Sequence, residues 1–289
     1  MTAHRILIAT DLDRTLLPNG AQSESAAARP LFARLVSRPE VTLAFVSGRH
    51  RELVEDAIAE FSLPQPDFVI GDVGTSIFHV DAPGRWSQPT GWEARIARDW
   101  GGLGHNELAG LLRDLATLEL QPADRQNVCK LSYFVPLEQA PDELEPEIIR
   151  RLEGAAVKAR LVWSIDEPAG AGLLDILPAS ASKLHALEAL MGSRGFAMKD
   201  TVFCGDSGND LEVLASPVPA VLVANAQPEV RTEALQRAKQ AGCEDRLYVA
   251  RGGYLGLNGN YSGGMLEGIA HYHPEISDWL PVANQRVSH

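Results

Sequence analysis

Short apolar runs that stop abruptly at a polar residue are the feature that most constrains the fold of this chain. Four such runs, each containing β-branched residues, lie at positions 5–10, 41–46, 201–205 and 219–224. Strands buried on both faces of a parallel sheet have this character. Amphipathic helical patterns lie between or after them, at 23–37, 50–61, 181–193, 209–216 and 228–240. This alternation predicts an α/β fold, a Rossmann-like doubly wound parallel sheet with helices on its faces.

The rhythm changes between residues 83 and 177, where a second domain is predicted. Helical patterns at 91–100 and 105–116 lead to a strand at 129–135, a helix at 141–154, and strands at 158–164 and 171–178. This order is typical of an α+β insert with a mostly antiparallel sheet. Turn residues at 81–84 and 177–180 mark the junctions. We therefore predict a core of 1–82 and 178–289 and an inserted cap of 83–177.

The composition excludes several classes of protein. The chain has 45% apolar and 22% charged residues and a formal net charge of −12. This balance disfavours nucleic acid and anionic membranes as partners, because both require a concentrated positive face. No apolar run approaches the about 18 residues of a membrane span, and the first residues lack a secretory signal pattern. Three scattered cysteines argue against a disulfide framework. We expect a cytoplasmic protein that is a monomer by default.

Candidate functional residues follow three of the predicted strands. They are Asp11 and Asp13 after the first, Ser47, Gly48 and Arg49 after the second, and Asp206, Asn209 and Asp210 after the third. Ligands of open parallel sheets bind beyond the carboxyl ends of the strands, so these loops are expected to face one crevice. Lys183, at the start of the helix that leaves the insert, is expected to reach it as well.

The clustered carboxylates predict a magnesium site. Like charges this close repel one another unless a cation neutralises them, and a cluster of oxygen ligands suits a hard cation with octahedral preference. Zinc and copper are disfavoured because these segments offer no thiol or imidazole. The predicted Mg2+ ligands are Asp11, Asp13, Asp206 and Asp210.

The same loops contain the groups that phosphoryl transfer needs. Asp11 is the candidate nucleophile, and Asp13 is the candidate acid that protonates the leaving alkoxide and later activates water. Donors to the phosphoryl oxygens are predicted at Ser47, the Gly48 amide and Lys183. Any one of these segments alone is more often a helix cap or a turn. Three of them after three different strands favour chemistry.

At this point the sequence resembles the haloacid dehalogenase-like phosphatases. The resemblance rests on DLDRT at 11–15, SGR at 47–49, Lys183 and GDSGND at 205–210. Within that superfamily the chain is most similar to the sucrose-phosphate phosphatases, through DVGT at 72–75, CKLSYFV at 129–135, LLDILPASASK at 173–183, VANAQPEV at 223–230 and SGGMLEGIAHY at 262–272. The resemblance implies Mg2+-dependent hydrolysis of sucrose 6F-phosphate, the last step of sucrose synthesis, through an aspartyl-phosphate on Asp11.

Substrate contacts are predicted in both domains. Gly48, Arg49 and Asn209 are the candidates in the core. Lys130 and Ser132 share one face of a cap strand by period-two alternation, and Asp175 interrupts another cap strand. Sugar hydroxyls bind groups of this kind. The alternative is that these are outward polar positions on a half-exposed sheet.

Other functions stay open on the sequence alone. Related bacterial enzymes act on mannosylfructose phosphate, glucosylglycerol phosphate or glucosyl- and mannosylglycerate phosphates. A phosphotransferase or mutase would use the same aspartate but a different acceptor. A degenerate domain that only binds a synthase would have lost at least one chemical residue, and none is missing here. Association with a sugar-phosphate synthase remains open as an additional role.

Overall fold

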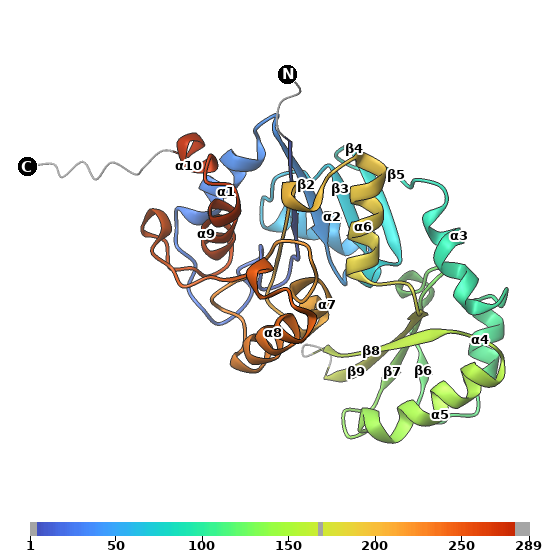
Figure 1. Cartoon of the computed structure of the whole chain (residues 1–289). Coiled ribbons are helices and arrows are strands. Elements are labelled where there is room, and N and C mark those ends of the chain that lie inside the picture. Colours follow the sequence, from blue (N-terminus) through green and yellow to red (C-terminus); the bar gives the residue numbers. More distant parts are fainter. Residues whose placement is uncertain (1–4, 167–169, 281–289) are drawn as a thin grey trace, which may run out of the picture. The chain divides into compact units, whose positions relative to one another are not determined.

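The computed structural model describes residues 5–166 and 170–280. The chain divides into two compact units, 1–88 with 186–289 and 89–185 (Figure 1). These junctions lie within eight residues of the predicted ones, at 82/83 and 177/178. The functional meaning of the units, a catalytic core and a cap, stays a prediction. Among the described residues, no helix is both long and apolar enough to cross a membrane.

The first unit is built on an eight-stranded sheet in the order β12-β11-β10-β1-β2-β3-β4-β5. Its strands are β1 Ile6–Thr10, β2 Val41–Val46, β3 Phe68–Gly71, β4 Ser76–Ala82, β5 Arg85–Ser87, β10 Thr201–Gly205, β11 Ala220–Leu222 and β12 Leu247–Val249. Pairing is parallel from β12 to β3 and antiparallel for β4 and β5. The predicted α/β class with a mainly parallel central sheet is confirmed.

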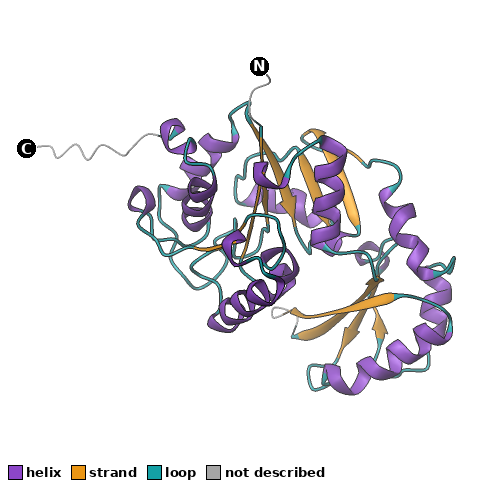
Figure 2. Ribbon diagram, viewed as in Figure 1, coloured by secondary structure: helices purple, strands orange, loops and turns teal. Residues whose placement is uncertain are grey.

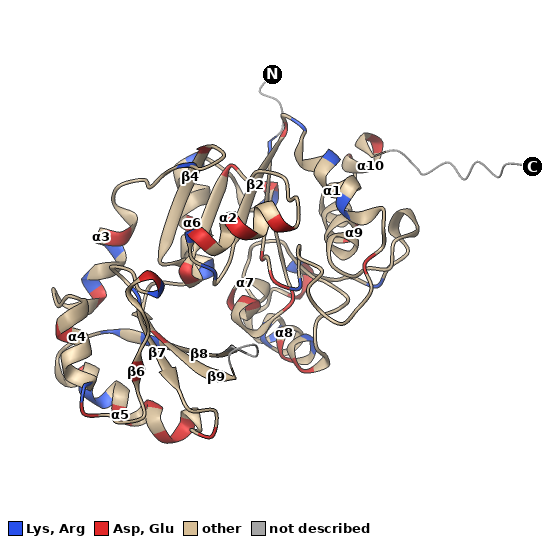
Figure 3. Cartoon of the chain, turned by 180° about the vertical axis from the view of Figure 1, so that it is seen from behind, with Lys and Arg blue, Asp and Glu red and all other residues tan. Residues whose placement is uncertain are grey.

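Helices connect these strands and cover the sheet (Figure 2). They are α1 Ala28–Val36, α2 Arg51–Glu60, α6 Lys183–Arg194, α7 Leu211–Leu214, α8 Pro228–Ala241, α9 Ser262–Tyr272 and α10 Ile276–Trp279. All five predicted core helices are present, although α1 begins at Ala28 rather than near residue 23. Acidic residues line the outer side of α2, as Figure 3 shows, in keeping with the net negative charge.

The core of this unit forms around β1, where residues 6–9 have no solvent exposure. Phe32 of α1 packs in the same apolar cluster as Met265 and Leu266 of α9. Helix α9 lies very close to β11 because Gly268 presents no side chain there: a Cβ at this position would be 2.3 Å from a methyl group of Val221. Close packing of this kind fixes the sheet whose strand ends carry the reactive loops.

The second unit has a four-stranded antiparallel sheet in the order β6-β7-β9-β8. Its strands are β6 Glu119–Leu120, β7 Leu131–Val135, β8 Ala159–Asp166 and β9 Ala171–Pro178, and its helices are α3 Trp92–Ile96, α4 His105–Leu112 and α5 Pro141–Gly154. The apolar cluster of this unit includes Trp100, Leu108, Ile148 and Leu174. The α+β arrangement matches the sequence prediction.

Two glycines provide a matched test of the packing of the first unit. Gly268→Ala is expected to lower the free energy of unfolding by about 1–3 kcal/mol, because the added methyl group overpacks α9 against β11. Gly192→Ala, in α6, meets nothing within 4 Å and is expected to raise that free energy by about 0.5–1 kcal/mol through helix propensity. Urea unfolding of both variants measures the difference. Equal effects would contradict the close approach at Gly268.

Candidate active site

Asp11 is the first residue after β1, and the sheet places it beside the end of β10. Its backbone N–H donates to the carbonyl of Cys204 at 2.9 Å, which continues the parallel pairing past Thr10. One carboxylate oxygen accepts a hydrogen bond from the N–H of Leu12 at 2.8 Å, and the side chain is 4% exposed. The carboxylate of Asp11 is therefore buried and oriented by its own loop.

Asp210 is held against the loop after β10 by that loop's backbone. Its Oδ2 accepts hydrogen bonds from the N–H groups of Asp206 and Ser207, both at 3.1 Å. Gly205 makes this possible, because a Cβ there would lie 2.6 Å from the Asp210 carboxylate. The first glycine of the GDSGND motif is thus required by a close approach.

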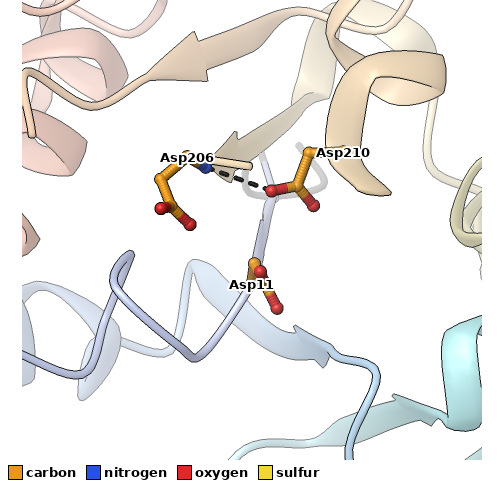
Figure 4. Close-up of side chains that lie close together, drawn as sticks. All are labelled: Asp11, Asp206 and Asp210. Atoms are coloured by element: carbon orange, nitrogen blue, oxygen red, sulfur yellow. Dashed lines mark hydrogen bonds between the residues drawn. The ribbon is translucent and has the colours of Figure 1, made fainter. Parts of the chain in front are cut away.

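Asp11, Asp206 and Asp210 form a buried carboxylate trio (Figure 4). One oxygen from each lies within 4.8 Å of the others. Asp206 also accepts a hydrogen bond from Thr15 Oγ1 at 3.0 Å, and Arg14 Nε lies 3.6 Å from its other oxygen. Three buried like charges with hard oxygen ligands fit Mg2+, which neutralises such clusters. Three of the four predicted metal ligands therefore lie together.

The fourth predicted ligand, Asp13, is engaged elsewhere. Arg49 donates to both of its oxygens, from Nε at 2.8 Å and from Nη2 at 2.7 Å. The hydrogen bond to Asp13 raises the pKa of Arg49. Asn19 donates to Asp13 Oδ1 at 2.7 Å. Two residues predicted to contact metal or substrate therefore bind each other.

Ser47 lies at the end of β2 and is fully buried. Its N–H donates to the carbonyl of Ile70 at 2.8 Å, and its Oγ accepts from the N–H of Arg49 at 3.2 Å. Gly48, between them, is half-buried. The predicted phosphoryl donors of this loop are thus fixed to the end of β3.

The turn after β3 braces the Ser47 loop and was not predicted to have a functional part. Asp72 and Val73 have φ values of 50° and 57°, in the left-handed region that such residues rarely adopt. Their N–H groups donate to the carbonyls of Arg49 and Ser47, at 3.0 and 3.1 Å. The DVGT segment, noted in the sequence only as a resemblance, was the available signal.

Asn225, three residues after β11, is a second residue whose role in the site the sequence analysis did not predict. It is 3% exposed. Its Nδ2 donates to the carbonyl of Arg14 at 2.6 Å, and its Oδ1 accepts from the N–H of Tyr261 at 2.8 Å. Arg14 has a φ of 58°. Asn225 thus secures the strained loop that follows β1. The signal was a polar residue ending the fourth apolar run.

The two remaining candidates differ in exposure, and Lys183 falls in the second unit while Asn209 falls in the first. Lys183 is the first residue of α6 and is 1% exposed. Asn209 is exposed and accepts a hydrogen bond from Ser207 Oγ at 3.1 Å. The contacts predicted for both with a phosphoryl group or substrate stay predictions.

The candidate sugar contacts of the second unit lie on its central strands. Ser132 of β7 and Asp175 of β9 are register partners, and Ser132 Oγ donates to Asp175 Oδ1 at 2.5 Å. Ser132 is fully buried, and Lys130, just before β7, is 7% exposed. The structure therefore brings Ser132 and Asp175 together as one polar pair.

Comparison with known proteins identifies the family. Residues 4–273 match the family model described as sucrose-6F-phosphate phosphohydrolase. The chain belongs to this family. It is a phosphoric monoester hydrolase with the haloacid dehalogenase-like fold, as the sequence predicted. The structure of the sucrose-phosphatase from Synechocystis in complex with sucrose and phosphate shares that fold, with a TM-score of 0.70, 23% identity, and coverage of 93% of this chain and 98% of that one.

Similar proteins differ in the substrate that their names state. A HAD-like hydrolase of Nitrosococcus oceani, whose name states no substrate, is 50% identical over 97% of this chain and 75% of its own length. The mannosylfructose-phosphate phosphatase of Agrobacterium fabrum is 30% identical over 92% of this chain and 96% of its own. Sucrose-phosphatase 1 of Nicotiana tabacum is 32% identical over 79% of this chain. The matched region is 52% of the length of that enzyme.

The carboxylate trio predicts a cation-dependent gain in stability. Mg2+ that binds only the folded chain should stabilise it by about 2.7 kcal/mol at 100 times its Kd, seen as a higher unfolding midpoint. We expect Asp206→Asn to remove most of this shift, and Gly205→Ala to reduce it by displacing the Asp210 carboxylate. Gly208→Ala is the matched control, because a Cβ there meets nothing within 4 Å. If Mg2+ raises the unfolding midpoint of Asp206→Asn as much as that of the unchanged protein, the cation does not bind at the trio.

Proposed function

We propose that the protein is a Mg2+-dependent phosphatase that hydrolyses sucrose 6F-phosphate to sucrose and phosphate through an aspartyl-phosphate on Asp11. The observation that carries this proposal is the buried trio at the ends of β1 and β10. It occurs in a chain that matches the sucrose-6F-phosphate phosphohydrolase family over residues 4–273. We place the reaction in the cytoplasm.

Mg2+ held by Asp11, Asp206 and Asp210 would supply neutralisation of the carboxylates and of the phosphoryl charge. The N–H of Leu12 fixes one Asp11 oxygen, so that the carboxylate is oriented before it attacks. An oxygen of Asp11 forms a bond to phosphorus as the bond from phosphorus to the sugar oxygen breaks. Asp13 gives its proton to that leaving oxygen.

The second step returns the enzyme to its starting state. Asp13, now a carboxylate, takes a proton from water as the water oxygen attacks the phosphorus. The bond between Asp11 and phosphorus breaks, which releases inorganic phosphate and restores both aspartates. Ser47, the Gly48 amide and Lys183 donate to the phosphoryl oxygens, on which negative charge collects in both steps.

Sucrose is assigned as the sugar on the family match. Lys130, Ser132 and Asp175 are the proposed sugar contacts in the second unit, which we propose is a cap. A second candidate, mannosylfructose phosphate, is favoured by the 30% identity to its phosphatase over nearly the whole of both proteins. Glucosylglycerol phosphate is a third. The glucosylglycerol-phosphate synthase of Pseudomonas anguilliseptica is 30% identical over 88% of this chain, and the matched region is 32% of that synthase. This relative also supports association of the phosphatase with a sugar-phosphate synthase.

Phosphate release from a substrate panel tests this proposal. The panel contains sucrose 6F-phosphate, mannosylfructose phosphate, glucosylglycerol phosphate and hexose 6-phosphates, each with Mg2+ or EDTA. We expect the highest kcat/KM for sucrose 6F-phosphate, and loss of release in EDTA. Preference for another glycosyl phosphate would replace the substrate and keep the chemistry.

The nucleophile is tested by Asp11→Asn, which is expected to lower kcat by at least about 1,000-fold, because the amide does not attack phosphorus. Asp245→Asn, at an exposed carboxylate, serves as the control and should leave kcat unchanged. Substantial turnover by folded Asp11→Asn would contradict the covalent route. Transfer of the phosphoryl group to another sugar, in place of release of inorganic phosphate, would indicate a phosphotransferase.

A further inference from the structure

The pair between Arg49 and Asp13 has the geometry of an orienting clamp. Two parallel N–H groups of the guanidinium contact the two carboxylate oxygens, at 2.8 and 2.7 Å. The third arm is also engaged, because Nη1 donates to the carbonyl of Leu53 in α2 at 3.2 Å. A bidentate pair fixes the plane of the carboxylate as well as its distance. The side chain of Arg49 is 24% exposed and that of Asp13 is 43% exposed.

A second set of hydrogen bonds also holds Asp13. Asn19 Nδ2 donates to Asp13 Oδ1 at 2.7 Å, while Asn19 Oδ1 accepts from the N–H of Arg14 at 2.8 Å. The carbonyl of Arg14 in turn accepts from buried Asn225. Asp13 is thus tied to α2 through Arg49 and to the end of the β11 segment through Arg14 and Asn19.

We propose that Arg49 is a positioning residue that orients Asp13 for proton transfer and holds its carboxylate apart from the cation-binding trio. Arg49 then acts through Asp13 and not as a ligand of the substrate phosphate. The trio contains Asp11, Asp206 and Asp210 and not Asp13, which supports this division. The inference rests on the proposed function, because it assigns a partner to that reaction's proton donor.

Two aryl phosphates separate these roles. Phenyl phosphate has a basic leaving oxygen that needs a proton, whereas p-nitrophenyl phosphate loses a phenolate that is stable without one. In Arg49→Met we expect kcat/KM for phenyl phosphate to fall about 100-fold, the usual range for a lost general acid. For p-nitrophenyl phosphate kcat/KM should change less than about threefold, while kcat and KM fall together because attack by water on the phosphoenzyme slows.

Matched variants identify the partner of Arg49. Asp13→Asn should give the same pattern, and the double variant should lose no more than Asp13→Asn alone. Arg49→Lys should recover part of the loss, since a lysine keeps the charge without the fork. Arg51→Met is the control: this neighbouring arginine contacts Glu55 and the carbonyl of Gly84, and its loss should leave the kinetics unchanged.

Equal losses of kcat/KM for both esters, with a raised KM, would overturn the proposal and make Arg49 a phosphate ligand. Additive losses in the double variant would overturn it as well. These esters carry no sugar, so their results decide the role of Arg49 even if every sugar phosphate in the panel fails.

Mn2+ affinity, measured by electron paramagnetic resonance without substrate, tests the separation of Asp13 from the trio. We expect Asp13→Asn and Arg49→Met to change Mn2+ affinity less than about twofold and Asp206→Asn to weaken it more than about tenfold. Weakening by Asp13→Asn as large as that by Asp206→Asn would show that the Asp13 carboxylate is a ligand, and would overturn the proposal.

Discussion

Mutual repulsion of three buried carboxylates is the constraint around which the rest of the structure is arranged. Two unit charges 4 Å apart repel by about 4 kcal/mol in a partly screened protein environment. Asp11, Asp206 and Asp210 are each at most 4% exposed, with oxygens within 4.8 Å of one another. Backbone N–H groups offset part of this repulsion, because they donate to Asp11 and to Asp210. The arrangement costs stability, which a cation bound by the trio would restore.

The parallel sheet supplies the rigidity that this arrangement requires. Residues 6–9 of β1 are wholly buried between β2 and β10, so the ends of β1 and β10 have little freedom to separate. Around the trio, backbone strain lies just beyond the strand ends, at Arg14, Asp72 and Val73. Each strained loop is held by hydrogen bonds, from Asn225 in one case and to the Ser47 loop in the other. Strain of this kind persists only where the surroundings over-determine it.

The sequence predicted the parallel strands β1, β2, β10 and β11 and the three reactive loops, because buried strands are continuous apolar runs with polar ends. It did not predict β3, β4, β5 or β12, which are short or lie at an antiparallel edge, where an apolar run is no longer required. Strand-end position predicted the three members of the trio together with Asp13, and it did not separate Asp13 from them. The pairing of Asp13 with Arg49 was not, because it depends on side-chain rotamers in two loops 36 residues apart. The hydrogen bonds by which Asp72 and Asn225 hold neighbouring loops are equally hard to predict from the sequence.

In the proposed enzyme, most of the groups assigned to the phosphoryl chemistry lie in the first unit. The trio, the Ser47 loop and the Asp13–Arg49 pair all belong to the first unit, and in the proposed mechanism they act on the phosphoryl group and the leaving oxygen. Relatives named for mannosylfructose phosphate and for sucrose phosphate are similarly distant from this chain, at 30% and 32% identity. In the proposed enzyme, discrimination among disaccharide phosphates therefore has to come from groups that contact the sugar. Ser132 is fully buried and already donates to Asp175. The half-buried Asp175 is therefore the member of this pair that we propose as a sugar contact, because a carboxylate accepts hydrogen bonds from hydroxyl groups.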